Sequence, residues 1–404
     1  MTDILDKFDA AIAEVASLKF EGPDPLGVVI EETISETEAI IDGRRTILAG
    51  TNNYMGMTFH PEAMEAAREA LEKHGTGTTG SRILNGTYKG HKALEAELAK
   101  FFGTDHAMVF STGYQANLGI ISALGQRGDY IIIDADSHAS IYDGCAMGNA
   151  DIVRFRHNNV EDLRKRLARL PKDAPKLVVL ESIYSMLGDQ APLKEMLEVA
   201  KEAGAQTLVD EAHSMGFCGE TGRGLAQELG VEHLCDFIVG TFSKSVGTVG
   251  GFCVSNHPKF EVLRFMSRPY MFTASLPPSV VASALASVRV LAHSGNRRAH
   301  LWENSKRLHK GLMEAGFTMG TKEAESPIIS LIMPEQEILF KFWQALLKEG
   351  AYVNVARPPA TPTGIFLVRC SLSAGHSNEQ IDQLLEKFKT AAEKVGVPLK
   401  QAAE

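Results

Sequence analysis

Short apolar runs rich in β-branched residues alternate with helical patterns from about residue 107 onward. The runs "AMVFST", "YIIID", "DIVRF", "KLVVLES", "QTLVDEA", "DFIVGTFS" and "GFCVSN" lie at 107–112, 130–134, 151–155, 176–182, 206–212, 236–243 and 251–256. The segments between them, such as "PLKEMLEVAKEAG", place apolar residues on one helical face and end at a glycine. This alternation is typical of a parallel sheet with helices on both faces. We therefore predict a large α/β domain around a mostly parallel, seven-stranded sheet.

The regions before and after this alternation have a different pattern. Upstream, 61–75 and 91–103 read as helices, and apolar residues repeat at helical spacing from Ile4 to Val15. After about residue 293 a charged helix precedes two short strands with a helix between them, and a last amphipathic helix starts at Glu379. We predict an N-terminal helix and segment over 1–55, a large domain over 56–292 and a smaller α+β domain over 293–404.

Composition narrows the class of protein. The 404 residues carry a net charge of −9 without a long basic run, which argues against a general nucleic-acid binder. Met271 to Val288 lacks charged residues, but Pro277 and Pro278 interrupt it, so we expect a turn and a buried helix instead of a membrane span. Acidic residues lie where a signal peptide would be apolar, and five dispersed cysteines form no C-x-x-C pair. Both features favour the cytoplasm, and neither indicates a metal site.

Polar residues follow several of the predicted strands, at the edge where a parallel sheet binds its ligands. They are Ser111, Thr112, Gly113, His138, Ser185, Asp210, His213, Thr241, Ser243 and Lys244. Each has an ordinary explanation when taken alone, because a lysine in a glycine-rich loop is usually a surface charge and a histidine after a strand is usually structural. Their occurrence at successive strand ends favours a functional site.

These groups are the parts needed to hold pyridoxal phosphate. The amine of Lys244 would form a Schiff base, the carboxylate of Asp210 would keep the pyridine nitrogen protonated, and hydroxyl and turn N–H groups would bind the phosphate. Lys244 is also the only lysine between Lys201 and Lys259. A competing motif is the G-x-G-x-x-G of "GTGTTG" (75–80), but it follows a helix and not a strand, which argues against a dinucleotide.

Seven segments occur in the order of one enzyme family's motifs and cover nearly the whole chain. They are "NNYMGM" (52–57), "GSRILNGT" (80–87), "STGYQAN" (111–117), "DSHAS" (136–140), "VDEAHSMGFCGETGRG" (209–224), "GTFSKSVGTVGG" (240–251) and "FLVRCSLSAGHS" (366–377). They resemble the α-oxoamine synthases, which use pyridoxal phosphate to condense an amino acid with an acyl-CoA thioester and release CO2. The resemblance implies a fold-type I, aspartate aminotransferase-like structure and a homodimer with its active site at the subunit interface.

The resemblance also assigns roles position by position. It implies catalytic roles for Lys244, His138, Asp210 and His213. It implies cofactor binding by Gly113, Tyr114, His138, Ser185, Asp210, His213, Thr241, Ser243, Lys244 and, from the other subunit, Thr273. It implies substrate binding by Asn53, Arg357 and Arg369. Because a guanidinium can hold a planar carboxylate with two hydrogen bonds, an arginine suits an amino-acid substrate.

Within the family, "ARPPATPTG" (356–364) is similar to the bacterial members that join L-serine to palmitoyl-CoA. That likeness implies L-serine and a long-chain acyl-CoA as substrates, and because the product is a lipid it leaves peripheral membrane contact open. Thr79 departs from these members, which have asparagine there, so the detail of dimer packing is also open. Two alternatives stay open: a sister synthase for glycine or alanine, such as an aminoketobutyrate, aminolevulinate or aminooxononanoate synthase, and a non-catalytic partner subunit.

Overall fold

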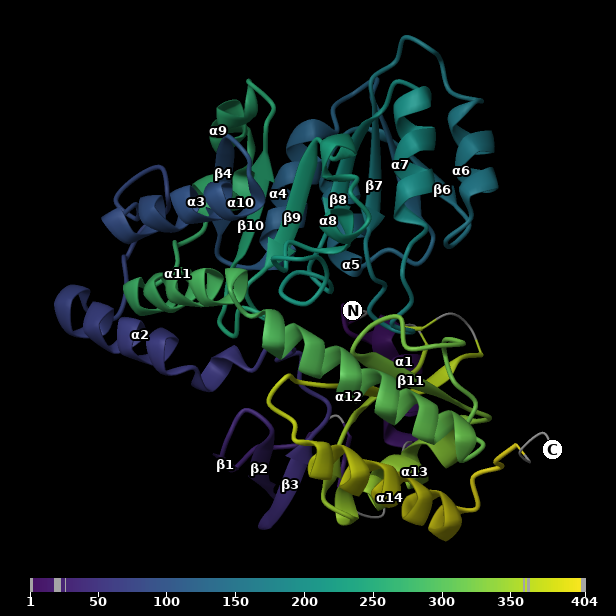
Figure 1. Cartoon of the computed structure of the whole chain (residues 1–404). Coiled ribbons are helices and arrows are strands. Elements are labelled where there is room, and N and C mark those ends of the chain that lie inside the picture. Colours follow the sequence, from purple (N-terminus) through teal and green to yellow (C-terminus); the bar gives the residue numbers. More distant parts are fainter. Residues whose placement is uncertain (1–2, 18–22, 26, 359, 362–363, 401–404) are drawn as a thin grey trace.

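The computed structural model describes residues 3–17, 23–25, 27–358, 360–361 and 364–400, with the side chains of 14–17 left out. A seven-stranded sheet with the order β4-β10-β9-β8-β7-β5-β6 forms the centre of its larger part (Figure 1). The strands are β4 (His106–Phe110), β5 (Tyr130–Asp134), β6 (Asp151–Phe155), β7 (Lys176–Glu181), β8 (Gln206–Asp210), β9 (Phe237–Thr241) and β10 (Gly251–Ser255). The seven predicted strands are therefore confirmed.

The sheet is parallel except at one strand. β6, β5, β7, β8 and β9 run parallel to one another, whereas β10 is antiparallel to both β9 and β4. Some predicted strands extend past the observed strand ends, because their last polar residues no longer form hydrogen bonds to a neighbouring strand. The N–H of Ser243, for example, donates to Thr241 Oγ1 at 3.3 Å instead of to a neighbouring strand.

Helices connect the strands and form the outer layers (Figure 1). The α-helices are α1 (Asp9–Ser17), α2 (Pro61–His74), α3 (Lys89–Phe102), α4 (Gly113–Leu124), α5 (Ala139–Met147), α6 (Val160–Leu167), α7 (Leu193–Glu202), α8 (Leu225–Glu228), α9 (Leu263–Met266), α10 (Arg268–Phe272), α11 (Pro278–Ala292), α12 (Gly295–Glu314), α13 (Gln336–Lys348) and α14 (Asn378–Val395). Short 3-10 helices occupy Asp6–Phe8, Met57–Phe59, Glu232–Leu234 and Phe260–Val262. The helices predicted over 61–75 and 91–103 are α2 and α3.

Alternate residues of the central strands belong to two separate cores. Ile131 and Ile133 of β5 pack in the core that contains residues of α4 and α5, whereas Ile132 packs with residues of α6 and α7. Each of the three isoleucines is 0% exposed. Because neighbouring side chains of a strand point to opposite faces, both faces of the sheet are covered by helices, as predicted.

The N-terminal and C-terminal segments fold together beside the large sheet. A four-stranded sheet contains β1 (Glu32–Thr33), β2 (Glu38–Ile41), β3 (Arg44–Leu48) and β12 (Ala351–Tyr352), and a three-stranded sheet contains β11 (Ile328–Met333), β14 (Phe366–Ser371) and β13 (Asn354–Ala356). β12 runs parallel to β3, with Ala351 paired to Ile47. The strands before residue 55 were not predicted, because their apolar runs are short and mixed with charged residues. The domain boundaries stay a prediction.

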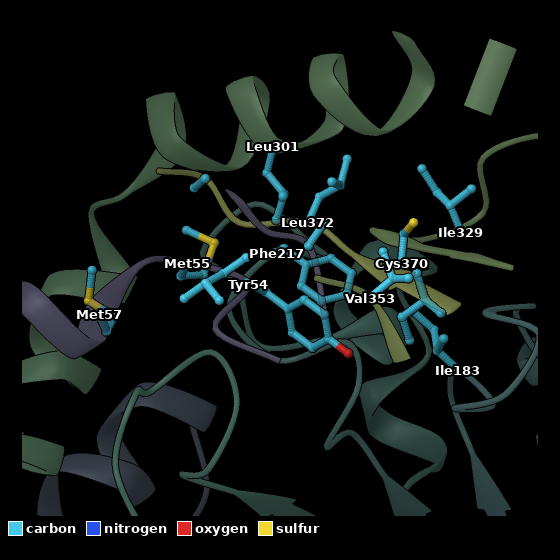
Figure 2. Close-up of a cluster of buried hydrophobic side chains, with 14 of the residues drawn as sticks. Tyr54, Met55, Met57, Ile183, Phe217, Leu301, Ile329, Val353, Cys370 and Leu372 are labelled. Atoms are coloured by element: carbon cyan, nitrogen blue, oxygen red, sulfur yellow. The ribbon is translucent and has the colours of Figure 1, made fainter. Parts of the chain in front are cut away.

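A cluster of buried apolar side chains joins these parts. Figure 2 shows Tyr54, Phe217, Leu301, Val353 and Leu372, which come from the N-terminal segment, the loop after β8, α12 and the C-terminal sheets. The rings of Tyr54 and Phe217 meet edge to face with their centroids 5.3 Å apart. The phenol oxygen of Tyr54 lies at the edge of the cluster, so the same side chain can pack in the core and reach a polar site (Figure 2).

Two searches of the described residues bear on function. No helix there is long and apolar enough to cross a membrane. The uncharged stretch from Met271 to Val288 holds the end of α10, a turn and most of α11, as predicted. Within the same described ranges, no group of three or more His, Cys, Asp or Glu side chains is arranged to hold a metal ion.

Candidate active site

The loops at the carboxyl ends of the strands enclose a cavity of about 280 Å³. Its lining residues are Thr112, Gly113, Tyr114, Asn117, His138, Ser140, Glu181, Asp210, Ala212, His213, Val239, Gly240, Thr241, Ser243 and Lys244. The structure thus brings together nine of the residues that the sequence predicted for the site. Asn117, Ser140 and Glu181 were missed by the sequence analysis, because each is a single polar residue inside or at the end of an otherwise ordinary helix or strand.

Lys244 lies half-buried in the loop after β9. Burial lowers the pKa of its amine to about 8, although the negative charge of Asp210 pulls that pKa upward. The fraction of neutral, nucleophilic amine at neutral pH is therefore much larger than for an exposed lysine, whose pKa is about 10.4. This is the form of the side chain that can attack a carbonyl carbon.

The glycines around Lys244 allow its loop to turn back on itself. The N–H of Phe242 donates to the carbonyl of Gly250 at 2.9 Å, which closes the loop. Gly247 has φ 76° and Gly250 has φ 139°, and a Cβ on Gly247 would come within 2.8 Å of Met57. Larger residues at these two positions would be strained or would clash. The loop therefore needs glycine on the C-terminal side of the lysine.

Asp210 ends β8 and is 7% exposed. Its Oδ2 accepts a hydrogen bond from Asn117 Nδ2 at 2.7 Å, and its Oδ1 accepts one from the N–H of Ala212 at 2.9 Å. The donor Asn117 belongs to α4 and also donates to Ser140 Oγ at 3.0 Å. These two hydrogen bonds fix the orientation of the carboxyl group in the cavity.

His138 stands at the N-terminus of α5, where its ring is fixed by Ser140. The N–H of Ser140 donates to His138 Nδ1 at 3.2 Å, and Ser140 Oγ lies 2.7 Å from the same nitrogen. Burial lowers the pKa of His138, and the positive charge of Lys244 lowers it further against the opposing effect of Asp210. A neutral ring whose Nδ1 accepts a hydrogen bond carries its proton on Nε2. His138 therefore offers one N–H donor.

The N-terminus of α4 is arranged as an anion site. Thr112 caps the helix by accepting the N–H of Gln115 at 3.0 Å, so the N–H groups of the first turn have no partner within the helix. A Cβ on Gly113 would lie 2.7 Å from the Cβ of Thr241, which leaves room there for glycine alone. Thr241 Oγ1 lies 2.8 Å from Ser243 Oγ, so two hydroxyl groups stand beside the helix end.

His213 connects the cavity to the N-terminal segment and to β14. Its Nδ1 lies 2.9 Å from Tyr54 Oη, and burial together with the positive charges of Lys244 and Arg369 holds its pKa far below the usual value. The guanidinium of Arg369 donates to Asn52 Oδ1 at 3.3 and 3.2 Å and to Tyr54 Oη at 3.4 Å. A neutral imidazole and a buried guanidinium therefore share one network at the cavity's edge.

The remaining predicted residues do not line this cavity. Asn53 is 7% exposed and donates to Thr58 Oγ1 at 2.7 Å, and its Oδ1 is buried without a hydrogen-bond partner among the described residues. Ser185 accepts a hydrogen bond from Arg369 Nε at its carbonyl, 2.6 Å away. Arg357 Nη1 donates to Gln336 Oε1 at 3.5 Å. Gln115 donates to Thr273 Oγ1 at 3.3 Å in the same chain.

A second cavity, of about 620 Å³, adjoins the first at His138, which lines both. Apolar side chains contribute much of its wall, among them Tyr142, Tyr184, Met186 and Leu187. Ser185 and Thr361 also line it, so the segment that the sequence analysis likened to the serine-using enzymes reaches this cavity. The two cavities together form a site with a polar end and a more apolar end.

Comparison with known proteins identifies the family. The family model for aminotransferase class I and II matches residues 45–388. The chain belongs to the class I and II aminotransferase family. It is 60% identical to a serine palmitoyltransferase from Sphingomonas paucimobilis over 98% of this chain and 94% of the relative. It is also 37% identical to an 8-amino-7-oxononanoate synthase from Lysinibacillus sphaericus, over 90% of this chain and 93% of the relative.

Solved structures of this aminotransferase family agree. A serine palmitoyltransferase from Sphingomonas wittichii superposes with a TM-score of 0.97 at 62% identity, covering 98% of this chain and all of that one. An SPT structure with a PLP internal aldimine matches with a TM-score of 0.97 at 59% identity, over 98% of this chain and 100% of that one. The predicted fold class and the resemblance to the α-oxoamine synthases are confirmed.

Proposed function

We propose that this chain is a pyridoxal-phosphate-dependent acyltransferase that condenses L-serine with palmitoyl-CoA or a similar long-chain acyl-CoA. The products are 3-ketodihydrosphingosine, CoA and CO2, which would make this the first step of sphingolipid synthesis. The observation that carries the proposal is that Lys244, Asp210 and His138 line one cavity beside the N-terminus of α4. The full-length similarity to serine palmitoyltransferases supports the choice of substrates.

The residues of the cavity fit pyridoxal phosphate. The α4 N-terminus, Thr241 and Ser243 offer N–H and hydroxyl donors for a phosphate. The hydrogen-bonded carboxylate of Asp210 suits a protonated pyridine nitrogen, and the imidazole of His138 suits one face of the ring. The half-buried amine of Lys244 suits the aldehyde. Each functional part of the cofactor thus has a chemically matched group in a cavity of about 280 Å³.

When bound, the cofactor supplies an electron sink for the amino acid's α-carbon. The chain's own groups then handle the protons and the charges. Lys244, with its pKa lowered to about 8, can take the α-proton at neutral pH and return it later. The carboxylate of Asp210 holds a proton on the pyridine nitrogen. His138 donates from Nε2 to the thioester oxygen as it gains negative charge.

Arg369 is the group that we assign to the serine carboxylate. Arg369 is 6% exposed, and its guanidinium lies at the edge of the cavity, where Asn52 and Tyr54 accept its hydrogen bonds. An incoming carboxylate can take over the contacts to the neutral amide of Asn52, because charged acceptors form stronger hydrogen bonds. Arg357 and Asn53 are proposed to contact the substrate from the same side.

The second cavity suits the acyl chain. It adjoins the catalytic cavity at His138, has a volume of about 620 Å³ and has several apolar side chains in its wall. The carboxyl groups of Asp136 and Asp143 in its wall would repel the phosphates of CoA, so the nucleotide end would stay outside. A thioester at the junction would place its carbonyl beside His138.

We further propose a homodimer, in which Thr273 reaches the phosphate site of the partner subunit. Within its own chain Thr273 does not line the catalytic cavity, and nearby Phe265, Met266 and Phe272 are 68%, 51% and 70% exposed. Apolar side chains this exposed suit burial in a subunit interface.

We also propose that the enzyme acts in the cytoplasm.

A substrate panel tests the proposed function. The purified protein is incubated with pyridoxal phosphate, one of L-serine, glycine or L-alanine, and an acyl-CoA of long or short chain, and CoA release is measured. We expect release with serine and a long-chain acyl-CoA, and none from Lys244→Ala. Faster turnover with glycine or alanine would favour the sister synthases. A protein that binds the cofactor but releases no CoA with any pair would favour the non-catalytic subunit.

A further inference from the structure

A second carboxyl group stands beside Asp210 in the catalytic cavity. Glu181 is the last residue of β7, Asp210 is the last residue of β8, and the two are paired in register across the parallel strands. Side chains of in-register residues on adjacent strands point to the same face and lie side by side. Both residues line the cavity, and Glu181 is 4% exposed. Two carboxylates at this spacing would repel each other unless one of them is neutral.

The carboxyl of Glu181 has a specific contact that the chemistry above does not use. Its Oε1 accepts the main-chain N–H of His138 at 2.6 Å. His138 is the N-cap of α5, so this contact fixes the main chain at the point where the imidazole leaves it. The contact spans 43 residues and joins the end of β7 to the loop after β5.

The surroundings decide which of the two carboxyl groups keeps the charge. Both carboxyl oxygens of Asp210 accept hydrogen bonds, Oδ2 from Asn117 and Oδ1 from the N–H of Ala212, so both oxygens act as acceptors. Burial and the charge of Asp210 raise the pKa of Glu181 to about 8, with Asp134 adding to the increase and Lys244 and the N–H of His138 opposing it. At neutral pH, Glu181 is therefore largely protonated in the folded protein.

We propose that Glu181 is a positioning residue, which holds the main chain of His138 with its carboxyl group while Asp210 alone keeps the negative charge of the cavity. The proposal rests on the proposed function insofar as His138 serves the cofactor and the thioester. The hydrogen bond between Glu181 and the N–H of His138 and the proton on Glu181 do not require the cofactor. Both can therefore be measured in the cofactor-free protein.

Hydrogen exchange of the cofactor-free protein tests the contact. In Glu181→Ala the N–H of His138 loses its acceptor, so exchange in peptides covering 135–142 should become faster by about tenfold or more. Glu181→Gln keeps an oxygen acceptor and should exchange within about twofold of the wild type. Glu211→Gln is the matched control, because Glu211 is a fully buried carboxyl that accepts from Leu225 and Ala226 instead. Unchanged exchange in Glu181→Ala would overturn the proposal.

The proton on Glu181 gives a second test, which needs only the glutamine variant. A folded-state pKa of about 8, above the ordinary glutamate value of 4.5, means that the folded protein binds more protons than the unfolded chain between these values. Stability from this group is therefore lost as the pH rises through that window. Glu181→Gln stays neutral throughout, so its melting temperature should rise relative to the wild type between about pH 5 and pH 8.5. A difference that does not change with pH would contradict a protonated Glu181.

Catalysis distinguishes positioning from a chemical role. We expect Glu181→Gln to keep its KM for serine and its kcat within about threefold of the wild type at pH 7, whereas Glu181→Ala loses about tenfold or more in kcat as His138 moves. A loss as large in the glutamine variant would show that the proton of Glu181 takes part in the reaction and would overturn positioning. If the substrate panel fails while the exchange result holds, the proposed function fails and the role of Glu181 in placing His138 stands.

Discussion

The phenol oxygen of Tyr54 lies 2.9 Å from Nδ1 of His213, although the two residues are 159 positions apart in the sequence. Tyr54 belongs to the N-terminal segment and packs against Phe217, while His213 follows β8 and lines the catalytic cavity. Arg369 donates to the same phenol oxygen at 3.4 Å. One buried hydroxyl therefore connects Arg369, which we propose binds the substrate carboxylate, to His213 in the cavity.

Tyr54→Phe removes this hydroxyl and keeps the ring. We expect a fall of about 1–3 kcal/mol in the free energy of unfolding, because buried partners lose a hydrogen bond. Urea denaturation of the cofactor-free protein at fixed protein concentration measures it. Tyr142→Phe is the control, since its bond to the carbonyl of Ala135 at 2.8 Å is exposed and should contribute less than about 0.5 kcal/mol. Equal losses in the two variants would contradict the network.

Lys244→Ala should abolish the covalent link to pyridoxal phosphate. The amine is the nucleophile of the cavity, so the variant should lack the visible absorbance of the linked cofactor and should lose CoA release by at least about a hundredfold. Absorption spectra and mass spectrometry after borohydride reduction provide the two measurements. Lys259→Ala replaces an exposed lysine and should match the wild type. A persistent visible band in Lys244→Ala would refute the assignment.

The lowered pKa of Lys244 predicts a pH dependence of cofactor capture. With a pKa of about 8, the neutral fraction of the amine, and hence the rate of capture, should rise about tenfold per pH unit and level off near pH 8. The folded protein binds fewer protons than the unfolded chain between about pH 8 and the ordinary lysine pKa of 10.5, so this group makes stability rise with pH there.

Stopped-flow absorbance of the cofactor-free protein measures this capture rate. Asp210→Asn is the matched variant, because the charge of Asp210 raises the pKa of Lys244. Its rate should level off at a lower pH than that of the wild type. A plateau above about pH 10, as for an exposed lysine, would contradict the buried amine.

Arg369→Lys tests the group assigned to the serine carboxylate. Lysine keeps the charge but cannot form two parallel hydrogen bonds to a carboxylate, and it cannot keep both the Ser185 carbonyl and Asn52 as acceptors. We expect KM for serine to rise by about tenfold to a hundredfold while KM for the acyl-CoA changes little. Steady-state kinetics with each substrate varied in turn provide the measurement. An equal rise in both KM values would point to general disruption.

Local sequence was enough to predict the large sheet and much of the cavity. Lys244, Asp210 and His138 each follow an apolar run, and the rule that ligands bind at the carboxyl ends of parallel strands places them together. Contacts between distant segments could not be predicted this way. Asn117 and Asp210 are 93 residues apart, and nothing in either local sequence indicates their hydrogen bond.

The same limit explains the strands that were missed. β3 pairs with β12, a strand far away in the sequence. The local pattern around Ile47 therefore does not indicate a strand by itself. Glu181 was overlooked for a related reason. Glu181 is the last residue of a buried strand, a position that does not by itself indicate a function. Its proposed role depends on its pairing with Asp210 in the next strand and on its hydrogen bond from the main chain of His138.

Thr79 provides the last prediction, which concerns stability. Its φ of 58° puts a β-branched residue in the left-handed region, where only glycine, asparagine and aspartate are readily accommodated. The side chain is exposed, and its contact is a hydrogen bond from Asn85 Nδ2 at 3.4 Å, which is long and therefore weak. Among the residues that the structure describes, little else compensates this strain.

Thr79→Asn and Thr79→Gly should therefore raise the free energy of unfolding by about 1 kcal/mol. Thr79→Ala is the control: it removes the branch and the hydroxyl but keeps a Cβ that disfavours this backbone conformation, so it should gain less than either. Chemical denaturation at one fixed protein concentration compares the four proteins under the same conditions for any association. If alanine stabilised as much as asparagine and glycine, side-chain contacts and not backbone strain would be the cause.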